Sequence, residues 1–297
     1  MFSQPCSAST YPLAVKPLNT IRSTSKAHQL STAAPGLRVL VPTMGALHRG
    51  HTALFEHARS IAGGKGTVIA SIFVNPTQFG PKEDFSRYPR PFLKDQRLCR
   101  NHGVNLLFAP SPDQMYQPDF SCWVDESSVG LGLCGGARPG HFRGVCTVVL
   151  KLFQILQPHV AVFGRKDFQQ CAVIARMVRD LNVPVKLVFA PTAREIDGLA
   201  LSSRNAYLTP TERQQAPTLH AALLEAKQRV ESGEKRAAIM RRLIARRLNQ
   251  CPDARIDYVS IVDSETLRPL KTITAPATAA IAVFFGKTRL IDNIQLC

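Results

Sequence analysis

Residues 38–74 read RVLVPTMGALHRGHTALFEHARSIAGGKGTVIASIFV, and this stretch decides the fold. The apolar run 38–41 predicts a strand that ends at the turn-forming residues 42–45. Apolar residues recur at helical spacing over 52–61, Gly63 and Gly64 end that helix, and 67–74 is a second apolar strand. A strand, a helix and a strand in this order predict a βαβ unit with parallel strands and a right-handed crossover.

The same alternation continues along the chain. Helical spacing is found over 94–102, 145–156 and 167–181, and strand-like apolar runs over 104–108, 159–163 and 185–189. Strands that alternate with helices predict an α/β protein with a Rossmann-like, doubly wound parallel sheet. Ligands of such sheets bind beyond the carboxyl ends of the strands.

The pattern changes after about residue 192. Two helices are expected over 217–232 and 234–250, followed by strands over 256–262, 278–285 and 288–294. We therefore expect a first domain over 1–192, which would hold the ligands, and a second, smaller α/β domain over 193–297, which could act as a lid.

Composition indicates a globular protein with a strong positive charge. Apolar residues make up 45% and no apolar run reaches the ~18–20 residues that span a membrane. The net charge of +16 favours anionic partners, whether nucleic acid, an acidic membrane or charged small molecules. Much of it lies at Lys235, Arg236, Arg241, Arg242, Arg246 and Arg247. Without interleaved aromatic residues, this run is better interpreted as a solvated helix face than as a nucleic-acid patch.

The cysteines and the N-terminus bear on location. Eight cysteines are scattered without C-x-x-C pairs or zinc-finger spacing, which indicates free thiols in a reducing compartment. Residues 1–35 are rich in Ser and Thr and have no acidic residue. This composition fits either an organelle transit peptide or a disordered tail that leads into an early strand and helix.

The first motif that suggests chemistry is His48-Arg49-Gly50-His51, between a strand and a helix. A helix N-terminus offers free N–H groups and a positive dipole end to an anion. Two imidazoles there could contact phosphate oxygens and donate a proton to a leaving group. Capping by two surface histidines is the structural alternative.

Three further motifs lie at predicted strand ends or loops. Leu201-Ser202-Ser203-Arg204-Asn205 combines hydroxyls with an arginine, which suits pyrophosphate or forms an ordinary surface turn. Gly164 to Gln170 offers a lysine for phosphate, Asp167 for ribose hydroxyls and the Gln170 amide, or is simply a basic helix start. Asn75 and Gln78 offer amides for a hydroxy acid, although Asn75-Pro76 is also a turn former.

Taken together and in order, these motifs resemble the pantoate–β-alanine ligase family of pantothenate synthetases, in the nucleotidyltransferase superfamily with the H-x-G-H motif. The resemblance runs from about 38 to 293. It also includes residues 84–90, the stretch Arg138-Pro139-Gly140-His141-Phe142-Arg143-Gly144-Val145, and 197–200. Six ordered motifs over most of the chain are specific, although no one of them is.

The resemblance implies a function and roles. It implies ATP-dependent joining of pantoate to β-alanine through a pantoyl adenylate, giving pantothenate, AMP and pyrophosphate for coenzyme A synthesis. His51, His48, Lys166 and Arg204 would be catalytic. Gln78, Gln170 and Asn75 would bind substrate. The ATP site would comprise Met44, Gly45, Ala46, Leu47, His48, Arg49, Gly50, His51, Gly164, Arg165, Lys166, Asp167, Ala193, Leu201, Ser202, Ser203 and Arg204.

Mg²⁺ would arrive with ATP rather than in an all-protein site. The resemblance further suggests a homodimer. We also expect a cytoplasmic protein that binds neither nucleic acid nor membrane. Three positions depart from the family pattern: Arg165, Leu201 and Ile196. Of these, Arg165 adds a charge next to the expected phosphate site. The alternatives are an adenylyltransferase of the same superfamily, which would form no amide, and a basic nucleic-acid-binding protein.

Overall fold

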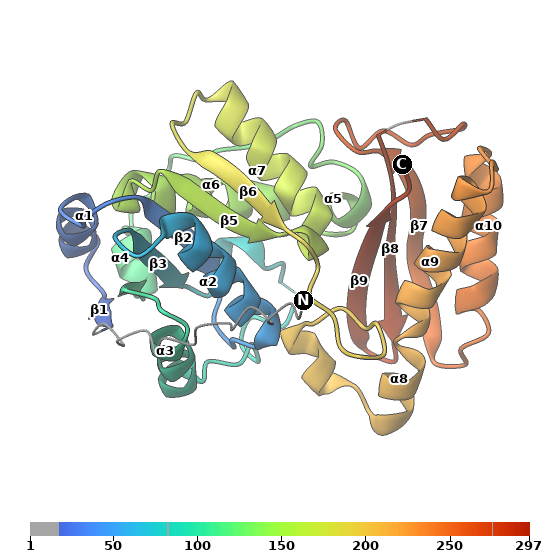
Figure 1. Ribbon diagram of the computed structural model, residues 1–297, viewed down its shortest axis with the longest axis horizontal. Coiled ribbons are helices and arrows are strands. Elements are labelled where there is room, and N and C mark those ends of the chain that lie inside the picture. The colour runs from blue at the N-terminus through green and yellow to red at the C-terminus, as the bar shows by residue number, and fades with distance from the viewer. Residues whose placement is uncertain (1–17, 82, 275) are drawn as a thin grey trace, which may run out of the picture.

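The computed structural model describes residues 18–81, 83–274 and 276–297, and it contains two sheets (Figure 1). The larger is six-stranded and parallel, in the order β1-β4-β3-β2-β5-β6. Its strands are β1 (Asn19–Ile21), β2 (Arg38–Thr43), β3 (Thr67–Ile72), β4 (Leu106–Phe108), β5 (Val160–Gly164) and β6 (Lys186–Ala190). The predicted parallel sheet is confirmed.

The βαβ unit predicted from 38–74 is present. β2 and β3 pair in parallel over their whole length, from Arg38 opposite Thr67 to Thr43 opposite Ile72. Helix α2 (Arg49–Ala62) connects them and buries Phe55 and Ala58 against the sheet. β3 ends two residues earlier than predicted, at Ile72, although the N–H of Phe73 still donates to the Thr43 carbonyl at 3.1 Å.

Helices cover both faces of this sheet. Residues of β2 alternate between two cores: Val39 and Val41 pack with α2 and α3 (Phe92–Asn101), whereas Leu40 packs with α6 (His141–Leu156) and α7 (Phe168–Asp180). This alternation follows from the two-residue period of a strand. The doubly wound arrangement is therefore confirmed, and loops from several strands meet at one carboxyl edge.

Several elements were not fully predicted. α6 begins at His141, four residues before the predicted start, because His141, Arg143 and Gly144 interrupt the apolar pattern in its first turn. β1 and α1 (Thr24–Thr32) form the early strand and helix that were one alternative for the N-terminal segment. The transit-peptide alternative was stated for residues 1–35, of which 1–17 lie outside the described residues. Short helices α4 (Pro112–Met115), α5 (Leu133–Ala137) and α8 (Pro210–Gln215) were not anticipated.

The smaller sheet is antiparallel and lies beside the larger one (Figure 1). It consists of β7 (Ala254–Asp263), β8 (Ala277–Phe285) and β9 (Thr288–Gln295), which are longer than the predicted strands. α9 (Thr218–Glu231) and α10 (Ala237–Leu248) pack on it with a core of their own. The arginines of α10 are mostly exposed, as expected for a solvated helix face.

Two further observations concern all of the described residues. In the described part of the chain, no helix has the length and apolar character needed to cross a bilayer. The seven cysteines within the described residues are free thiols, of which Cys99, Cys134, Cys146 and Cys171 are buried.

Candidate active site

A large cleft lies between the two sheets. It has a volume of about 920 Å³ and is lined from one side by residues such as Lys166 and Gln170, and from the other by residues such as Arg289 and Asn293. A second cavity of about 240 Å³ lies at the carboxyl ends of β2, β3 and β5. The two share the residues Arg138, His141, Lys166, Asp167, Gln170, Ser202 and Arg204, so they form one continuous site.

A buried carboxylate hydrogen-bonds to the backbone of the loop after β2 and fixes its position. Asp95 of α3 is 1% exposed, and its two oxygens accept hydrogen bonds from the backbone N–H groups of Ala46 and Leu47, both at 2.8 Å. Gly45 (φ 81°) lies so close that a Cβ there would be 3.0 Å from Asp95 Oδ2. These two amides are therefore not available to a phosphate, and side chains must do that work.

His48 and His51 cap helix α2 reciprocally. His48 Nδ1 accepts the N–H of Gly50 at 3.1 Å, and His51 Nδ1 accepts the N–H of His48 at 3.3 Å. The two rings lie 4.1 Å apart between centroids. Glycine is required at the third position of the motif, because a Cβ on Gly50 would be 2.9 Å from the His48 ring. The spacing H-x-G-H thus has a structural cause.

This geometry fixes the protonation of both rings. Burial lowers the pKa of His48 to about 4, and the charge of Lys166 adds to the effect while Asp167 opposes it. Burial, together with His48 and Lys166, lowers the pKa of His51 to about 3. Both imidazoles are therefore neutral at pH 7. Because each Nδ1 accepts a backbone N–H, each proton is on Nε2, and both Nε2–H groups are hydrogen-bond donors.

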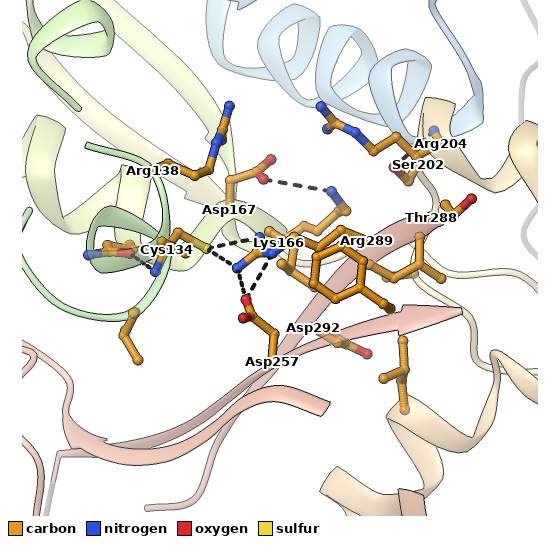
Figure 2. Close-up of a pocket in the computed structure, with 18 of the residues that line it drawn as sticks. Cys134, Arg138, Lys166, Asp167, Ser202, Arg204, Asp257, Thr288, Arg289 and Asp292 are labelled. Atoms are coloured by element: carbon orange, nitrogen blue, oxygen red, sulfur yellow. Dashed lines mark hydrogen bonds and ion pairs between the residues drawn. The ribbon is translucent and has the colours of Figure 1, made fainter. Parts of the chain in front are cut away.

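The turn between β5 and α7 supplies Lys166 and Asp167. Lys166 Nζ lies 3.6 Å from Asp167 Oδ1 (Figure 2), and both residues line the site. Asn293 of β9 donates from Nδ2 to the carbonyls of Arg165 and Lys166, both at 3.0 Å. The smaller sheet thereby holds this turn in place.

The Arg165 side chain takes another direction. Its Nε donates to the carbonyl of Phe189 in β6 at 3.3 Å, and Arg165 is not among the residues that line either cavity. The concern that this departure from the family pattern places a charge next to the phosphate site therefore has no support in the geometry.

The segment 201–205 reaches the site from the connection between the sheets. Leu201, Ser202, Ser203 and Arg204 line the smaller cavity together with Ala193, whose carbonyl accepts the N–H of Leu201 at 2.9 Å. The Ser202 hydroxyl accepts the N–H of Arg204 at 3.2 Å. Its place next to Lys166 and the two histidines agrees with the expectation that these motifs act together.

Asn75 and Gln78 form a buried pair at the end of β3. Asn75 Nδ2 donates to Gln78 Oε1 at 3.2 Å and to the Gly144 carbonyl at 3.1 Å, and its Oδ1 accepts from Tyr116 and Thr77. Protein groups thus take up its hydrogen-bonding capacity. Asn75, which was expected to bind substrate, is placed to orient Gln78, whose Nε2 is directed to Met44 Sδ at 2.9 Å.

A chain of side chains supports the backbone of Gln78. The carbonyl oxygen of Gln78 accepts from His141 Nδ1 at 2.8 Å and from Arg138 Nη2 at 3.3 Å. Arg138 donates to His141 Nε2 at 3.0 Å and forms a two-point ion pair with Glu83. Burial and the Arg138 charge lower the pKa of His141 to about 4, although the Gln78 carbonyl and nearby carboxylates oppose this.

In the wall of the larger cleft, Arg289 of β9 joins the smaller sheet to helix α5. Its two terminal nitrogens are each 3.6 Å from Cys134 Sγ of α5, and Nη2 is 2.8 Å from Asp257 Oδ2 (Figure 2). The Tyr258 hydroxyl is 3.3 Å from the same sulfur. These contacts fix how the smaller sheet faces the Lys166 turn.

The structure brings together most of the residues that the sequence singled out. Those that line the site are Met44, His48, Gly50, His51, Asn75, Gln78, Gly164, Lys166, Asp167, Gln170, Ala193, Leu201, Ser202, Ser203 and Arg204. Gly45, Ala46, Leu47, Arg49 and Arg165 do not line it. The first three belong to the turn held by Asp95, and Arg49 is exposed.

Residues that sequence reasoning did not single out as functional are Glu83, Asp84, Asp95, Arg289 and Asn293. Asp84 lies in a motif of the resemblance, which was a usable signal. Asp95 offered no such signal, because its two backbone partners lie 48 and 49 positions earlier in the chain. Nothing in the local sequence indicates this contact. Within the described residues, no cluster of three or more His, Cys, Asp or Glu side chains could hold a metal ion.

Comparison with known proteins gives a consistent result. The family model described as pantoate-beta-alanine ligase matches residues 15–295. The chain is 52% identical over 257 residues to the pantothenate synthetase of Moorella thermoacetica, covering 86% of this chain and 90% of that protein. It is 51% identical over 256 residues to that of Thermotoga neapolitana, with coverage of 86% and 90%.

Solved structures agree. The pantothenate synthetase of Thermus thermophilus superposes with a TM-score of 0.88 at 46% identity, covering 94% of this chain and 99% of that one. The Francisella tularensis ligase, in complex with beta-gamma ATP and beta-alanine, gives 0.76 at 30% identity, with coverage of 94% and 98%. The chain belongs to the pantoate–β-alanine ligase family.

Proposed function

We propose that this protein joins pantoate to β-alanine at the expense of ATP, through a pantoyl adenylate. One observation carries the proposal most directly. Lys166, Arg204 and the Nε2–H groups of two neutral histidines surround one continuous cleft, which also presents the Gln78 and Gln170 amides. Cations and donors suit a polyphosphate, and amides suit a hydroxy acid.

ATP would lie at the carboxyl edge of the parallel sheet, with its phosphates among His48, His51, Lys166, Ser202, Ser203 and Arg204. The Ala193 backbone would lie near the adenine, and Asp167 could accept from the ribose. The Francisella relative was solved in complex with Beta-gamma ATP and beta-alanine, which supports ATP as a ligand of this protein. Mg²⁺ would bind through the phosphate oxygens of ATP.

In the first step a carboxylate oxygen of pantoate attacks the α-phosphorus, and the bond to the bridging oxygen of pyrophosphate breaks. Lys166 and Arg204 stabilise the charge that builds on the phosphates. With a free-enzyme pKa of about 3, His51 would act as a neutral hydrogen-bond donor through Nε2. No covalent intermediate with the protein is required.

In the second step the amine of β-alanine attacks the acyl carbon of the adenylate, and AMP leaves. Gln78 would contact both pantoate and β-alanine, and Gln170 would contact pantoate. Asn75 would act through Gln78. The residues from 193 onward would form a lid domain that shields the adenylate from water, with a boundary after residue 192.

The family resemblance supports three further proposals: that the protein is a homodimer, that it works in the cytoplasm, and that it binds neither nucleic acid nor membrane. The exposed arginines of α10 contribute part of the net charge of +16, and they lie on the surface away from the site. Sedimentation of the purified protein checks the dimer, and retention on nucleic acid at about 0.5 M salt checks for more than electrostatic binding.

The test of the function is product analysis. Purified protein is incubated with Mg-ATP, D-pantoate and β-alanine, and we expect pantothenate and AMP in equal amounts. Transfer of AMP to an acceptor without amide formation would instead identify an adenylyltransferase and overturn the proposal.

A further inference from the structure

Two consecutive acidic residues contact two of the arginines that line the site. Glu83 pairs with Arg138, and Asp84 pairs with Arg204, although the two arginines belong to segments far apart in the chain. Both arginines line both cavities, and both acids line the larger one. One loop therefore places negative charge on two cations of an anion-binding cleft.

The Glu83 contact has the geometry of a permanent ion pair. Arg138 Nε is 2.8 Å from Oε1 and Nη2 is 2.5 Å from Oε2. The remaining nitrogen donates to His141. Burial raises the pKa of Glu83, but the hydrogen bond and charge of Arg138 outweigh it, so that the pKa is lowered. This pair holds the loop and supports Gln78.

The Asp84 contact is different. A single distance of 3.2 Å joins Arg204 Nη2 to Asp84 Oδ1, and this is the one side-chain partner of the Arg204 guanidinium among the described residues. Asp84 is 19% exposed and Arg204 31%. One long contact between two partly buried side chains is weak compared with the two-point contact that a guanidinium makes with phosphate.

We propose that Asp84 occupies on Arg204 the place of a phosphate oxygen of ATP, so that nucleotide binding exchanges the carboxylate for the phosphate. The inference rests on the proposed function, which assigns Arg204 to the phosphates. Figure 2 shows Arg204 next to Ser202 on one side of the cleft, with Arg138 on the other and Lys166 between them. Asp84 thus lowers the affinity for the polyphosphate while keeping the guanidinium paired in the empty site.

Removing this charge should tighten binding. Asp84→Asn keeps the size of the side chain and removes the competing anion, so we expect Mg-ATP and inorganic pyrophosphate to bind about two- to fivefold more tightly, the range that a partly exposed ion pair supports. The gain should shrink at about 0.5 M salt, because it is electrostatic. Calorimetric titration of the full-length protein measures both.

The controls separate this role from a structural one. Asp84→Glu restores the charge, and its affinity for Mg-ATP should return toward that of the wild type. Asp180→Asn removes a charge from an exposed ion pair outside the site and should leave the affinity for Mg-ATP unchanged. Equal or weaker binding by Asp84→Asn would mean that Asp84 only orients Arg204, and would overturn the inference.

The proposed function fails separately. If wild-type protein binds no Mg-ATP, or if Arg204→Gln binds it as tightly as wild type, the assignment of Arg204 to phosphate is wrong and the inference falls with it. Loss of binding in Arg204→Gln together with tighter binding in Asp84→Asn is the result that we expect.

Discussion

His48 and His51 cap the same helix end in opposite directions: the backbone N–H of His48 is bound by the ring of His51, and the ring of His48 binds the N–H of Gly50. The neutral rings are thereby held with Nε2–H as the free donor on each. Histidine capping, the structural alternative considered for this motif, and phosphate contact are therefore compatible, because they use different nitrogens of the same ring.

Gly50→Ala should disable the site with little loss of fold. The added Cβ would come within 2.9 Å of the His48 ring and 3.3 Å of Leu201 Cβ, so the ring must leave its capping position. We expect kcat to fall at least about tenfold and the free energy of unfolding to change by about 1 kcal/mol, the typical contribution of a cap. Gly64→Ala, at the other end of α2, has open space and should keep wild-type turnover. Wild-type activity in Gly50→Ala would contradict the role of this glycine.

Asp95→Asn should loosen the loop that positions the histidines. The amide can accept from only one of the two N–H groups and turns a donor toward the other, which leaves a buried group unsatisfied at a cost of about 1–3 kcal/mol. We expect lower thermal stability and a fall in kcat that exceeds any change in the KM for ATP. Chemical denaturation and steady-state kinetics measure the two effects. Unchanged kcat in a destabilised protein would show that Asp95 serves the fold alone.

The lowered pKa values of the half-buried histidines predict a loss of stability in acid. His51 has a folded pKa of about 3 against about 6.5 in the unfolded chain, so between these values only the unfolded state binds the proton. Its contribution is complete above pH 6.5 and is lost as pH falls toward 3. Denaturant unfolding measures the free energy of unfolding at pH 7 and at pH 5. The decrease between these pH values should be smaller by about 1–2 kcal/mol in His51→Gln than in the wild-type protein.

Glutamine can still accept the N–H of His48, which keeps the cap and makes this variant suitable. The exposed His57→Gln is the matched control and should follow the wild-type pH dependence. The same pH dependence in His51→Gln as in wild type would contradict the assignment of a neutral His51.

A buried ion pair ties the connection between the sheets to β9. Arg194 contacts Asp292 at 2.7 and 2.9 Å, and Asp292 is 2% exposed. Asp292→Asn removes the buried carboxylate that pairs with the partly buried Arg194 guanidinium and should cost about 3 kcal/mol. Asp180→Asn breaks an exposed pair and should cost under about 1 kcal/mol. Denaturant unfolding measures the decrease in the free energy of unfolding in each variant. Equal decreases would show that burial does not make this ion pair contribute more than an exposed one.

The alternation of apolar runs and helical spacing was enough to predict the parallel sheet, since a strand buried on both faces has a strong local signal. Helix α6 was predicted to begin at Val145 rather than His141, because the uninterrupted apolar pattern starts only after His141-Phe142-Arg143-Gly144. The site residues in compact motifs, such as His48 and Ser202, were predicted because the chemistry and the spacing coincide.

Support from distant segments could not be predicted in this way. Asp95 reaches the loop after β2 from α3, and Asn293 reaches the Lys166 turn from the last strand. These contacts depend on how the helices and the two sheets pack. For the same reason Asn75 was expected at the substrate, whereas its hydrogen bonds go to protein groups.

The most direct test of the central claim is ATP–pyrophosphate exchange by purified protein with Mg²⁺, with and without D-pantoate and in the absence of β-alanine. We predict exchange that requires pantoate, is reduced at least about a hundredfold in His51→Ala, and is retained in His57→Ala. No exchange with pantoate from folded, ATP-binding protein, or undiminished exchange in His51→Ala, would contradict the pantoyl adenylate and the part that His51 plays in forming it.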